Sequence, residues 1–544
     1  MDAASLSIDG REGALAAGES IFRAAERLGL HVPTSCHEQG KCRECLVEIE
    51  SGGAALTARA AEEEHLPARF RLACRARRAG PGPVAAHTMR RGALRIEEGS
   101  RGLDAAAELD PRYRRRGTVL TRDGRAVGTI AGPPLGVAVD LGTTTVVLGL
   151  VDLESGALVA TQSFENPQRF GGSDVMARIR YDGDHRGRLL QRVLLGYLGR
   201  ALASFPAAPE TIVELVVAGN PTMRDLLFGL DVHPIGQLPY RSRTEHELAA
   251  GVRATTSLEA PARALRLPLH PAATVYGLPL VASHVGADAA ACLLATGIAE
   301  RDGVAMCMDV GTNTEVLIGH RGRILAASCP AGPAFEGGGV RCGMPGLEGA
   351  IERVRLRSNG AVEYEVIGGG PPLGICGSGL VDLVSELART GRMSAQGRFT
   401  GDDGDGTFTV DAAHGIVLTE HDVNELAQAK GANAAGVRIV ADRFGVDLAR
   451  VERFYLAGGF GRHLDAAAAR RIGLIPDLPP ERIVQVGNAS LAGAARVLRS
   501  RGDRSRLEAL VRRVEHVALE SHPAFFDCFV DGCQFVPFGG GGAT

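Results

Sequence analysis

Residues 136–151, GVAVDLGTTTVVLGLV, and residues 304–319, VAMCMDVGTNTEVLIG, share one design that decides the fold of most of the chain. In each stretch an apolar strand ends at an aspartate, Asp140 or Asp309, and a turn of glycine and hydroxyl residues leads straight into a second apolar strand. The repetition predicts one strand–turn–strand unit, duplicated in the two halves of a large α/β domain.

Both turns suit phosphate. Backbone amides and threonine hydroxyls can donate to phosphate oxygens, and an aspartate can hold Mg²⁺, usually through water. A third element, RFYLAGGFGRHLD at 453–465, ends a strand in a flat glycine turn that leaves room for a nucleoside. We therefore predict nucleotide contacts from the two hairpins and the glycine turn: Gly142, Thr143, Thr144, Thr145, Gly311, Thr312, Asn313, Gly458, Gly459, Phe460 and Gly461.

Four of the eleven cysteines cluster near the start of the chain: Cys36, Cys42, Cys45 and Cys74. Four thiolates are what an iron–sulfur cluster requires, and Gly40 lets the ligand loop fold tightly around it. Zinc is the alternative, although its knuckles normally come as two C-x2-4-C pairs, whereas the fourth cysteine here stands alone. The other cysteines show no ligand set and are interpreted as packing residues.

Composition sets the outer limits. A chain of 544 residues with 45% hydrophobic and 23% charged residues predicts two to four globular domains, and the net charge of −3 gives no reason to expect nucleic acid. The sequence shows no secretory signal and no run of roughly eighteen apolar residues. We therefore expect a cytoplasmic protein with no membrane partner.

A basic, proline-bearing stretch separates the cysteine region from the hairpins. We predict a ferredoxin-like domain over residues 1–92, a linker or small linker domain over 93–133, and a two-lobed domain over 134–544, with lobes of about 134–300 and 301–544. Within the connector, RYRRR at 112–116 reads as a solvated positive face, the alternative being a docking patch for an acidic redox partner.

The amino-terminal order of strand hairpin, helix, C-x5-C-x2-C loop and strand resembles a [2Fe-2S] ferredoxin with a β-grasp fold, and its spacing is nearer to the adrenodoxin type. The two hairpins and the glycine turn resemble the actin, sugar kinase and Hsp70 (ASKHA) ATPase superfamily. That resemblance implies two ribonuclease H-like halves that clamp ATP and Mg²⁺. Together they give a multidomain fold of the α+β and α/β classes.

Other positions are less decisive. Asp288 matches the position that in Hsp70-like ATPases is acidic and close to the attacking water, and a helix cap is its alternative. Asn220 follows a strand and is a further phosphate-facing candidate, and Glu336 lies in a glycine-rich loop shaped for a ligand. Lys430, one of two lysines, is interpreted as a solvated helix residue.

Taken over nearly its whole length, the chain resembles the reductive activators of corrinoid-dependent methyltransferases. GKCRECLVEI, RLACRAR, VAVDLGTTTVV, DVGTNTEVLIG and LAGGFGRHLD are among the stretches that carry the likeness. The family implies an ATP-hydrolysing enzyme that reduces Co(II) in a corrinoid protein to Co(I), fed by an electron-donating reductase. It makes the four cysteines cluster ligands and Asp140, Asp288 and Asp309 catalytic, and it leaves a homodimer open. Some relatives bear carboxy-terminal [4Fe-4S] sites, for which the cysteines are lacking here.

Three rival functions remain at this point. An ASKHA small-molecule kinase with a regulatory Fe–S domain would phosphorylate a hydroxyl compound without a protein partner. An activator of a radical dehydratase would also couple ATP to low-potential electrons, but typically shares one [4Fe-4S] cluster across a dimer. A chaperone-like clamp with a redox sensor would need a peptide-binding domain, of which the sequence shows no sign.

Overall fold

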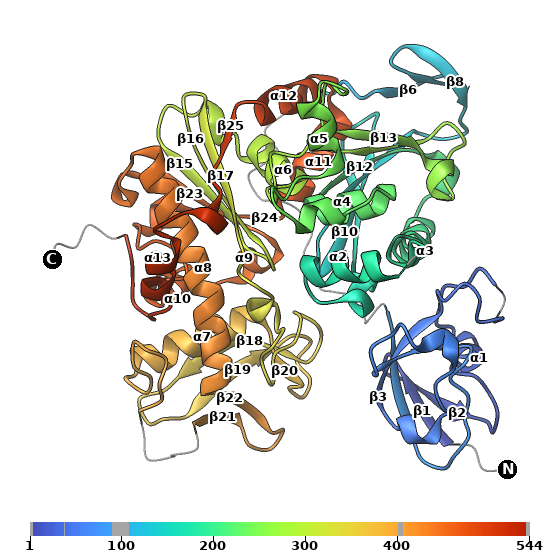
Figure 1. Ribbon diagram of the computed structural model, residues 1–544, viewed down its shortest axis with the longest axis horizontal. Coiled ribbons are helices and arrows are strands. Elements are labelled where there is room, and N and C mark those ends of the chain that lie inside the picture. The colour runs from blue at the N-terminus through green and yellow to red at the C-terminus, as the bar shows by residue number, and fades with distance from the viewer. Residues whose placement is uncertain (1–3, 37, 90–107, 186, 401–405, 540–544) are drawn as a thin grey trace.

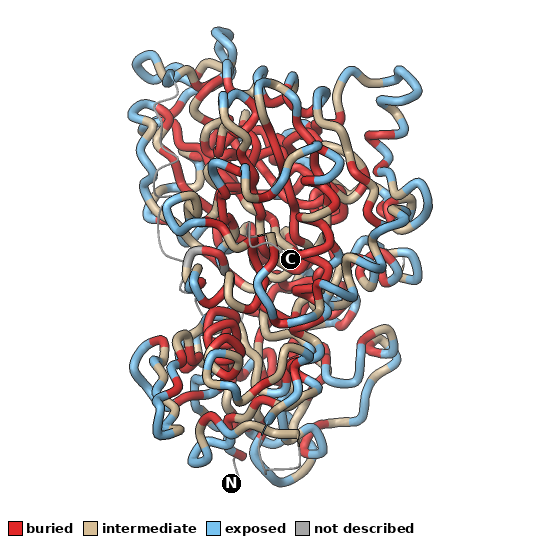
Figure 2. Tube along the Cα trace, turned by 90° about the vertical axis from the view of Figure 1, so that its left-hand side faces the viewer, coloured by how far each residue is buried: buried red, intermediate tan, exposed pale blue. Residues whose placement is uncertain are grey.

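The computed structural model describes residues 4–36, 38–89, 108–185, 187–400 and 406–539. Figure 1 shows a small amino-terminal domain beneath one lobe of a larger two-lobed body. Buried residues concentrate in the central strands and the helices packed on them, and exposed residues lie mainly in peripheral loops (Figure 2). Within the described ranges, no helix combines the length and apolar character that crossing a bilayer requires.

The amino-terminal domain is a mixed five-stranded sheet in the order β2-β1-β5-β3-β4, with β1 parallel to β5 and the other pairs antiparallel. Ser20 caps the helix α1 by accepting a hydrogen bond from the Arg23 amide. The buried face of this helix consists of Ile21, Phe22, Ala24 and Ala25. This confirms the expected β-grasp arrangement. The elements are β1 (Ala4–Ile8), β2 (Arg11–Leu15), α1 (Ile21–Arg27), β3 (Leu46–Ser51), β4 (Phe70–Leu72) and β5 (Val84–Thr88).

The basic connector is a folded sheet where it is described. Strands β6 (Tyr113–Arg116), β7 (Val119–Arg122) and β8 (Arg125–Thr129) form an antiparallel meander. Tyr113 is fully buried and donates a hydrogen bond to the Ala272 carbonyl (3.0 Å), which fixes the meander on the neighbouring lobe. Residues 90–107 of the expected linker lie outside the described residues.

Lobe one is built on a six-stranded sheet in the order β11-β10-β9-β12-β14-β13. Strands β9, β10 and β11 are antiparallel, and β12 joins β9 in parallel, as in a ribonuclease H-like half. Its elements are β9 (Leu135–Leu141), β10 (Thr145–Asp152), β11 (Leu158–Glu165), α2 (Val175–Asp184), α3 (Leu189–Ala203), β12 (Ile212–Gly219), α4 (Pro221–Phe228), α5 (Arg243–Ala249), β13 (Leu258–Pro261), β14 (Thr274–Gly277) and α6 (Ala287–Thr296).

Lobe two repeats the five-strand core of this sheet in the order β24-β23-β15-β16-β17, and its sixth strand, β25, lies beside β17, at the edge opposite to that of β13 in lobe one. The long helix α8 crosses behind its sheet, and a smaller α/β insertion lies between β17 and α8 (Figure 1). Its elements are β15 (Ala305–Asp309), β16 (Thr314–His320), β17 (Arg323–Cys329), β18 (Ala350–Leu356), β19 (Val362–Val366), β20 (Gly374–Ile375), α7 (Gly377–Arg389), β21 (Thr407–Asp411), β22 (Ile416–Thr419), α8 (Glu420–Phe444), β23 (Arg453–Ala457), α9 (Gly459–His463), α10 (Ala466–Arg471), β24 (Ile483–Gly487), β25 (Val514–His516) and α13 (Phe525–Gly532).

Two helices from the second half of the chain pack in lobe one. After β24 the chain crosses into lobe one, where α11 (Ala489–Arg499) and α12 (Arg501–Val511) share a core with α6 and the lobe-one sheet. A Cβ on Gly493 would lie 2.2 Å from the Ala291 carbonyl oxygen, so only glycine allows α11 to approach α6 this closely. A division of the two lobes at residue 300 therefore leaves α11 and α12 on the opposite side in space.

Candidate functional site

A cavity of about 350 Å³ lies between the lobes and is lined by both threonine hairpins. Each hairpin turn comes directly after the end of a central strand, β9 or β15. The duplicated fold brings the two turns face to face. Of the predicted contacts, the cavity wall contains Asp140, Gly142, Thr143, Thr144, Thr145, Asp288, Asp309, Gly311, Thr312, Asn313, Gly458 and Gly459.

The hairpins touch across the cleft. The Thr144 and Thr312 hydroxyl oxygens are 3.0 Å apart, and Thr144 donates to a Glu336 carboxylate oxygen at 2.8 Å. Thr312 donates to the same oxygen. Burial raises the pKa of Glu336, and these two hydroxyl donors counter the rise. Glu336 therefore bridges the two phosphate-type turns, at the point where phosphate oxygens would enter.

The glycine turn adjoins the second hairpin. Gly458 has φ +95° and a Cβ there would lie 2.5 Å from the Val310 carbonyl oxygen, so this position requires glycine. A Cβ on Gly459 would meet nothing within 4 Å, which leaves open space above the start of α9. Gly461 packs toward Leu456 and is absent from the cavity wall, and the Phe460 side chain lies outside the described ones.

Besides Glu336 and Glu352, four carboxylates line the cavity: Asp140, Asp288, Asp309 and Glu315. Burial, with the charges of Asp309 and Asp140 added, raises the pKa of Asp288 to about 7. Burial and the Asp140 charge likewise raise the pKa of Asp309 to about 6. Burial also raises the pKa of Glu315. Acids that repel one another in a buried pocket are stabilised by a cation placed among them.

Each motif aspartate is held by residues that the motif does not contain. Asn488 donates to Asp140 at 2.7 Å and Ser490 does so at 3.0 Å, both from the start of α11. Asp309 accepts a hydrogen bond from the Cys292 thiol of α6 at 3.1 Å. Cys292 is fully buried in the core, as expected of a packing residue, and it also holds Asp309 from behind the cavity wall. Residues of α11 and α6 thus hold the two motif aspartates.

Behind the first hairpin lies a buried support that no sequence motif marked. Arg178 of α2 donates to the Thr143 carbonyl at 2.7 Å, and Asn166 donates to the Gly142 carbonyl at 2.8 Å. Asn220, the candidate after β12, lines the cavity and donates to the Thr143 hydroxyl at 3.0 Å. Their hydrogen bonds hold the turn in shape while its inner face stays directed at the cavity.

The four amino-terminal cysteines form two pairs. The Cys45 and Cys74 sulfurs are 3.4 Å apart, and the Cys42 thiol and amide donate to Cys36. Although burial acts to raise it, these donors and the Lys41 and Gln39 amides lower the pKa of Cys36 to about 7. Two sulfur pairs, with amides donating to sulfur, fit a group with two irons, each bound by two thiolates.

Among the described residues, no three His, Cys, Asp or Glu side chains are placed to hold one metal ion between them.

One expectation outside the site turns out differently, whereas the connector arginines keep the solvent exposure expected of them. Lys430 is buried, with 1% of its surface exposed, and donates to the Gly532 carbonyl, so its interpretation as a solvated lysine is wrong. In the connector, Arg114 pairs with Asp110 and Arg115 with Glu154 at 3.0 Å. Those arginines fasten the meander to nearby acids.

Buried Lys430 should give the protein a pH-dependent stability. Burial lowers its pKa to about 7, so between pH 7 and about 10 the unfolded chain binds the extra proton. Stability contributed by this region therefore rises with pH across that window. In Lys430→Met we expect this slope to vanish and the melting temperature at pH 7 to stay level or rise. Arg438→Met, on the same helix, is the control, because arginine stays charged throughout. A Lys430→Met slope equal to the wild type's would contradict the assignment.

The fold and the site define a class of protein: a ferredoxin-type iron–sulfur domain joined to an ASKHA-type nucleotide clamp. Models of three known domains match the chain in the same order. They are a 2Fe-2S iron–sulfur cluster binding domain at residues 7–78, the RACo middle region at 135–301, and the C-terminal ASKHA domain of RACo at 303–538.

Relatives that match most of the chain are corrinoid-protein activators or reductases. The corrinoid activation enzyme RamQ of Eubacterium limosum is 30% identical over 431 residues, covering 74% of this chain and 70% of RamQ. A [Co(II) methylated amine-specific corrinoid protein] reductase of Methanosarcina barkeri is 26% identical, covering 71% and 73%. The solved structure of a reductive activator for corrinoid, iron–sulfur protein is 27% identical, covers 98% of both chains, and superposes with a TM-score of 0.71. The chain therefore belongs to the RACo family of corrinoid activation enzymes.

Proposed function

We propose that this protein is an ATP-dependent reductive activator of a corrinoid protein. It passes one electron from its [2Fe-2S] domain to inactive Co(II), which becomes Co(I) able to accept a methyl group in a methyltransferase or O-demethylase system. The observation that carries the proposal is a four-cysteine ferredoxin domain docked on a two-lobed nucleotide clamp. The activities named for RamQ and for the M. barkeri reductase support it.

ATP is needed because the electron moves uphill. In a one-electron step each 59 mV against the gradient costs a factor of ten, about 1.4 kcal/mol. A clamp that binds the corrinoid protein differently in its two nucleotide states can supply this difference. The duplicated hairpins provide such a clamp, because phosphates bound between them contact both lobes.

The residues have distinct proposed roles at the nucleotide. The hydroxyls and amides of the two hairpins bind the phosphates, and the Gly458–Gly459 turn accommodates the nucleoside. Asp140 and Asp309 hold the water shell of Mg²⁺, which when bound neutralises phosphate charge. Asp288, whose raised pKa lies near neutrality, is placed to orient or deprotonate the attacking water. The Asp288 carboxylate also accepts a hydrogen bond from the Ala289 amide (2.8 Å) in the first turn of α6, so it serves the helix end as well.

Further partners follow from the electron path. Four cysteines in one chain supply a complete cluster, so electrons enter through the amino-terminal domain from a separate reductase. We propose cytoplasmic activity, where such a reductase and a corrinoid client meet, and a homodimer stays open to a sedimentation measurement. The domains proposed are residues 1–92, the connector 93–133 and the clamp 134–544, with α11 and α12 placed in lobe one.

A spectroscopic assay tests the function. A corrinoid-binding methyltransferase subunit carrying cob(II)alamin is mixed, without oxygen, with the chemically reduced full-length protein, and Co(I) absorbance is followed. We expect fast Co(I) formation with ATP and slow or no formation with ADP. Phosphorylation of a hydroxyl compound, with no effect of ATP on cobalt, would instead favour an ASKHA kinase.

A further inference from the structure

The ferredoxin domain is fastened to lobe one by a buried contact next to the cysteine site. Arg169, in the turn Pro167–Gly171, pairs with Glu48, and their side chains are only 11% and 7% exposed. The same guanidinium donates to the Thr88 carbonyl at 3.0 Å. Because Glu48 lies on β3, which begins immediately after Cys45, the contact holds the strand that leads out of the ligand loop.

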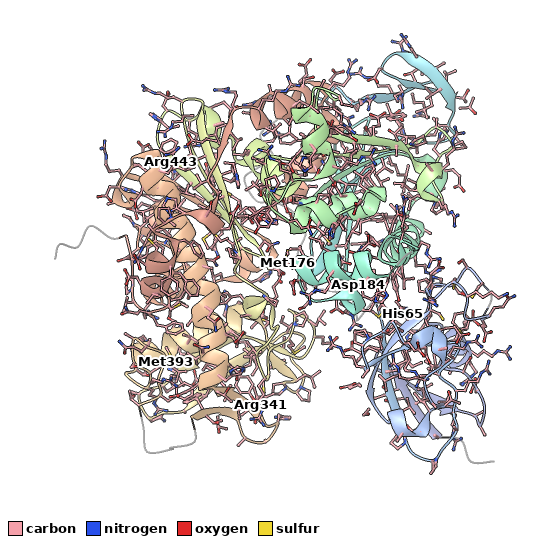
Figure 3. The ribbon with its side chains drawn as sticks, in the orientation of Figure 1. His65, Met176, Asp184, Arg341, Met393 and Arg443 are labelled. Carbon is pink, nitrogen blue, oxygen red and sulfur yellow. The ribbon has the colours of Figure 1, made fainter. Side chains whose placement is uncertain are left out.

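Two helices of lobe one add to this docking surface. From α3, Tyr197 accepts a hydrogen bond from the Met89 amide at 3.1 Å. At the end of α2, the His185 ring lies 5.9 Å from the ring of His65, and Figure 3 shows His65 beside Asp184 at the boundary of the two bodies. The ferredoxin domain therefore rests on α2, α3 and the Pro167–Gly171 turn.

The elements that bear the ferredoxin domain also hold the first phosphate hairpin. Asn166, immediately before the Pro167–Gly171 turn, donates its amide to the Thr144 carbonyl at 2.7 Å and its side chain to Gly142. In α2, Arg178 holds Thr143, less than two turns before His185, whose ring lies beside that of His65 in the ferredoxin domain. Two short connections thus run from the hairpin to the docked domain.

At its other face the hairpin is bonded to lobe two. Thr144 donates to Glu336 and touches Thr312 across the cleft. Phosphate oxygens entering between the turns compete for these hydroxyls, and they repel the Glu336 carboxylate. Nucleotide therefore replaces the contacts that position Gly142–Thr145 in the arrangement where the ferredoxin is docked.

We propose that nucleotide binding and ferredoxin docking oppose each other, coupled through Asn166 and the Pro167–Gly171 turn and through Arg178 and α2. ATP in the cleft loosens the Arg169–Glu48 contact and frees the ferredoxin domain to approach an electron acceptor. This inference rests on the proposed function for its purpose. Its physical content is a coupling free energy between two sites of one chain.

Reciprocity gives the test. If ATP weakens docking, then weakening docking must strengthen ATP binding by the same factor. Glu48→Gln removes the charge of the ferredoxin partner, keeps its shape and leaves every ATPase residue intact. In the full-length protein with its cluster, we expect the affinity for the nonhydrolysable analogue AMP-PNP with Mg²⁺, measured by calorimetry, to tighten about fivefold or more.

Two more variants frame the result. Tyr197→Phe removes the acceptor of the Met89 amide within the same interface, and we expect it to tighten AMP-PNP binding in the same direction. Arg115→Ala breaks an ion pair between the connector sheet and Glu154 of lobe one, outside the ferredoxin interface, and we expect no change. Damage to folding would weaken nucleotide binding, so a tighter complex cannot come from a merely structural loss.

Hydrogen–deuterium exchange measures the opposite effect, that of nucleotide binding on ferredoxin docking. In the wild type we expect AMP-PNP to raise amide exchange in the Val84–Thr88 and Leu46–Ser51 strands, and in Glu48→Gln these strands already exchange faster without nucleotide. Unchanged or weaker AMP-PNP binding in both interface variants, or exchange that ignores nucleotide, would overturn the coupling. Neither readout involves cobalt, so the coupling can fail or hold independently of the activity proposed above.

Discussion

Asp309→Asn should lower the rate of ATP hydrolysis about 100-fold or more and remove the acceleration of cobalt reduction by ATP. Asp309 sits at the end of β15 in the wall of the cavity that Asp140 also lines, and burial together with the Asp140 charge raises its pKa to about 6. The substitution keeps the shape and the Cys292 contact region but deletes a charge that would hold hydrated Mg²⁺ against the phosphates. Losses of this size are typical when a positioned acid or electrostatic group is removed.

The measurement is phosphate release together with Co(I) formation in the same preparation. Asp302→Asn, an exposed aspartate a few residues earlier in the chain, is the matched control and should behave as the wild type. If Asp309→Asn abolished hydrolysis yet left ATP-stimulated cobalt reduction at full rate, hydrolysis and electron transfer would not be coupled.

The second large effect is expected from Cys74→Ala. Its sulfur lies 3.4 Å from that of Cys45, and the substitution leaves that pair with a single thiolate. We expect loss of most of the iron, of the visible absorption and of all cobalt reduction. ATP hydrolysis should stay within about twofold, because the nucleotide cavity is built wholly from the two lobes.

Cys528→Ala is the control for this variant. Cys528 lies on α13, which packs on α8 of lobe two, and it should keep full iron content. A Cys74→Ala protein that retained a complete [2Fe-2S] spectrum and reduced cobalt would show that the cluster uses other ligands. Electron paramagnetic resonance of the reduced wild type should give the signal of a [2Fe-2S] centre, and a [4Fe-4S] signal would favour the dehydratase activators.

The sequence predicted those parts of the site that local pattern controls. A strand followed by D-x-G-T and a second strand is a continuous stretch, so both hairpins and their facing positions could be expected from residues alone. Gly458 was also predicted, because a strand ends there in a run of glycines. Its positive φ and its close approach to the Val310 carbonyl explain why the position requires glycine. The four cysteines were found because they cluster and the other seven do not.

The rest depends on contacts between distant segments. Asn488 and Ser490 meet Asp140 only because α11 crosses into the other lobe, a feature that periodicity does not encode. Glu315 looks like an ordinary residue of a strand, and Lys430 looked solvated because its helix is polar at several other positions. Burial of one charged side chain is decided by what packs on it, here the carboxy-terminal segment around Gly532.

The connector shows the same limit. Its sequence predicted a linker or small linker domain, and where it is described the segment is a sheet fastened to lobe one by Tyr113 and by the ion pairs Arg112–Glu259 and Arg115–Glu154. The contact that joins ferredoxin to clamp is instead Arg169 with Glu48, two residues that no motif singles out.

One measurement addresses the central claim most directly. The reduced [2Fe-2S] protein and a Co(II) corrinoid protein both carry unpaired electrons, whereas the oxidised cluster and Co(I) give no such signal. In freeze-quenched single-turnover samples we predict that the two paramagnetic signals disappear together, one for one, when ATP is present and persist when ADP replaces it. Signals that persist with ATP, or that decay equally fast with ADP, would contradict ATP-driven transfer of one electron from this cluster to cobalt.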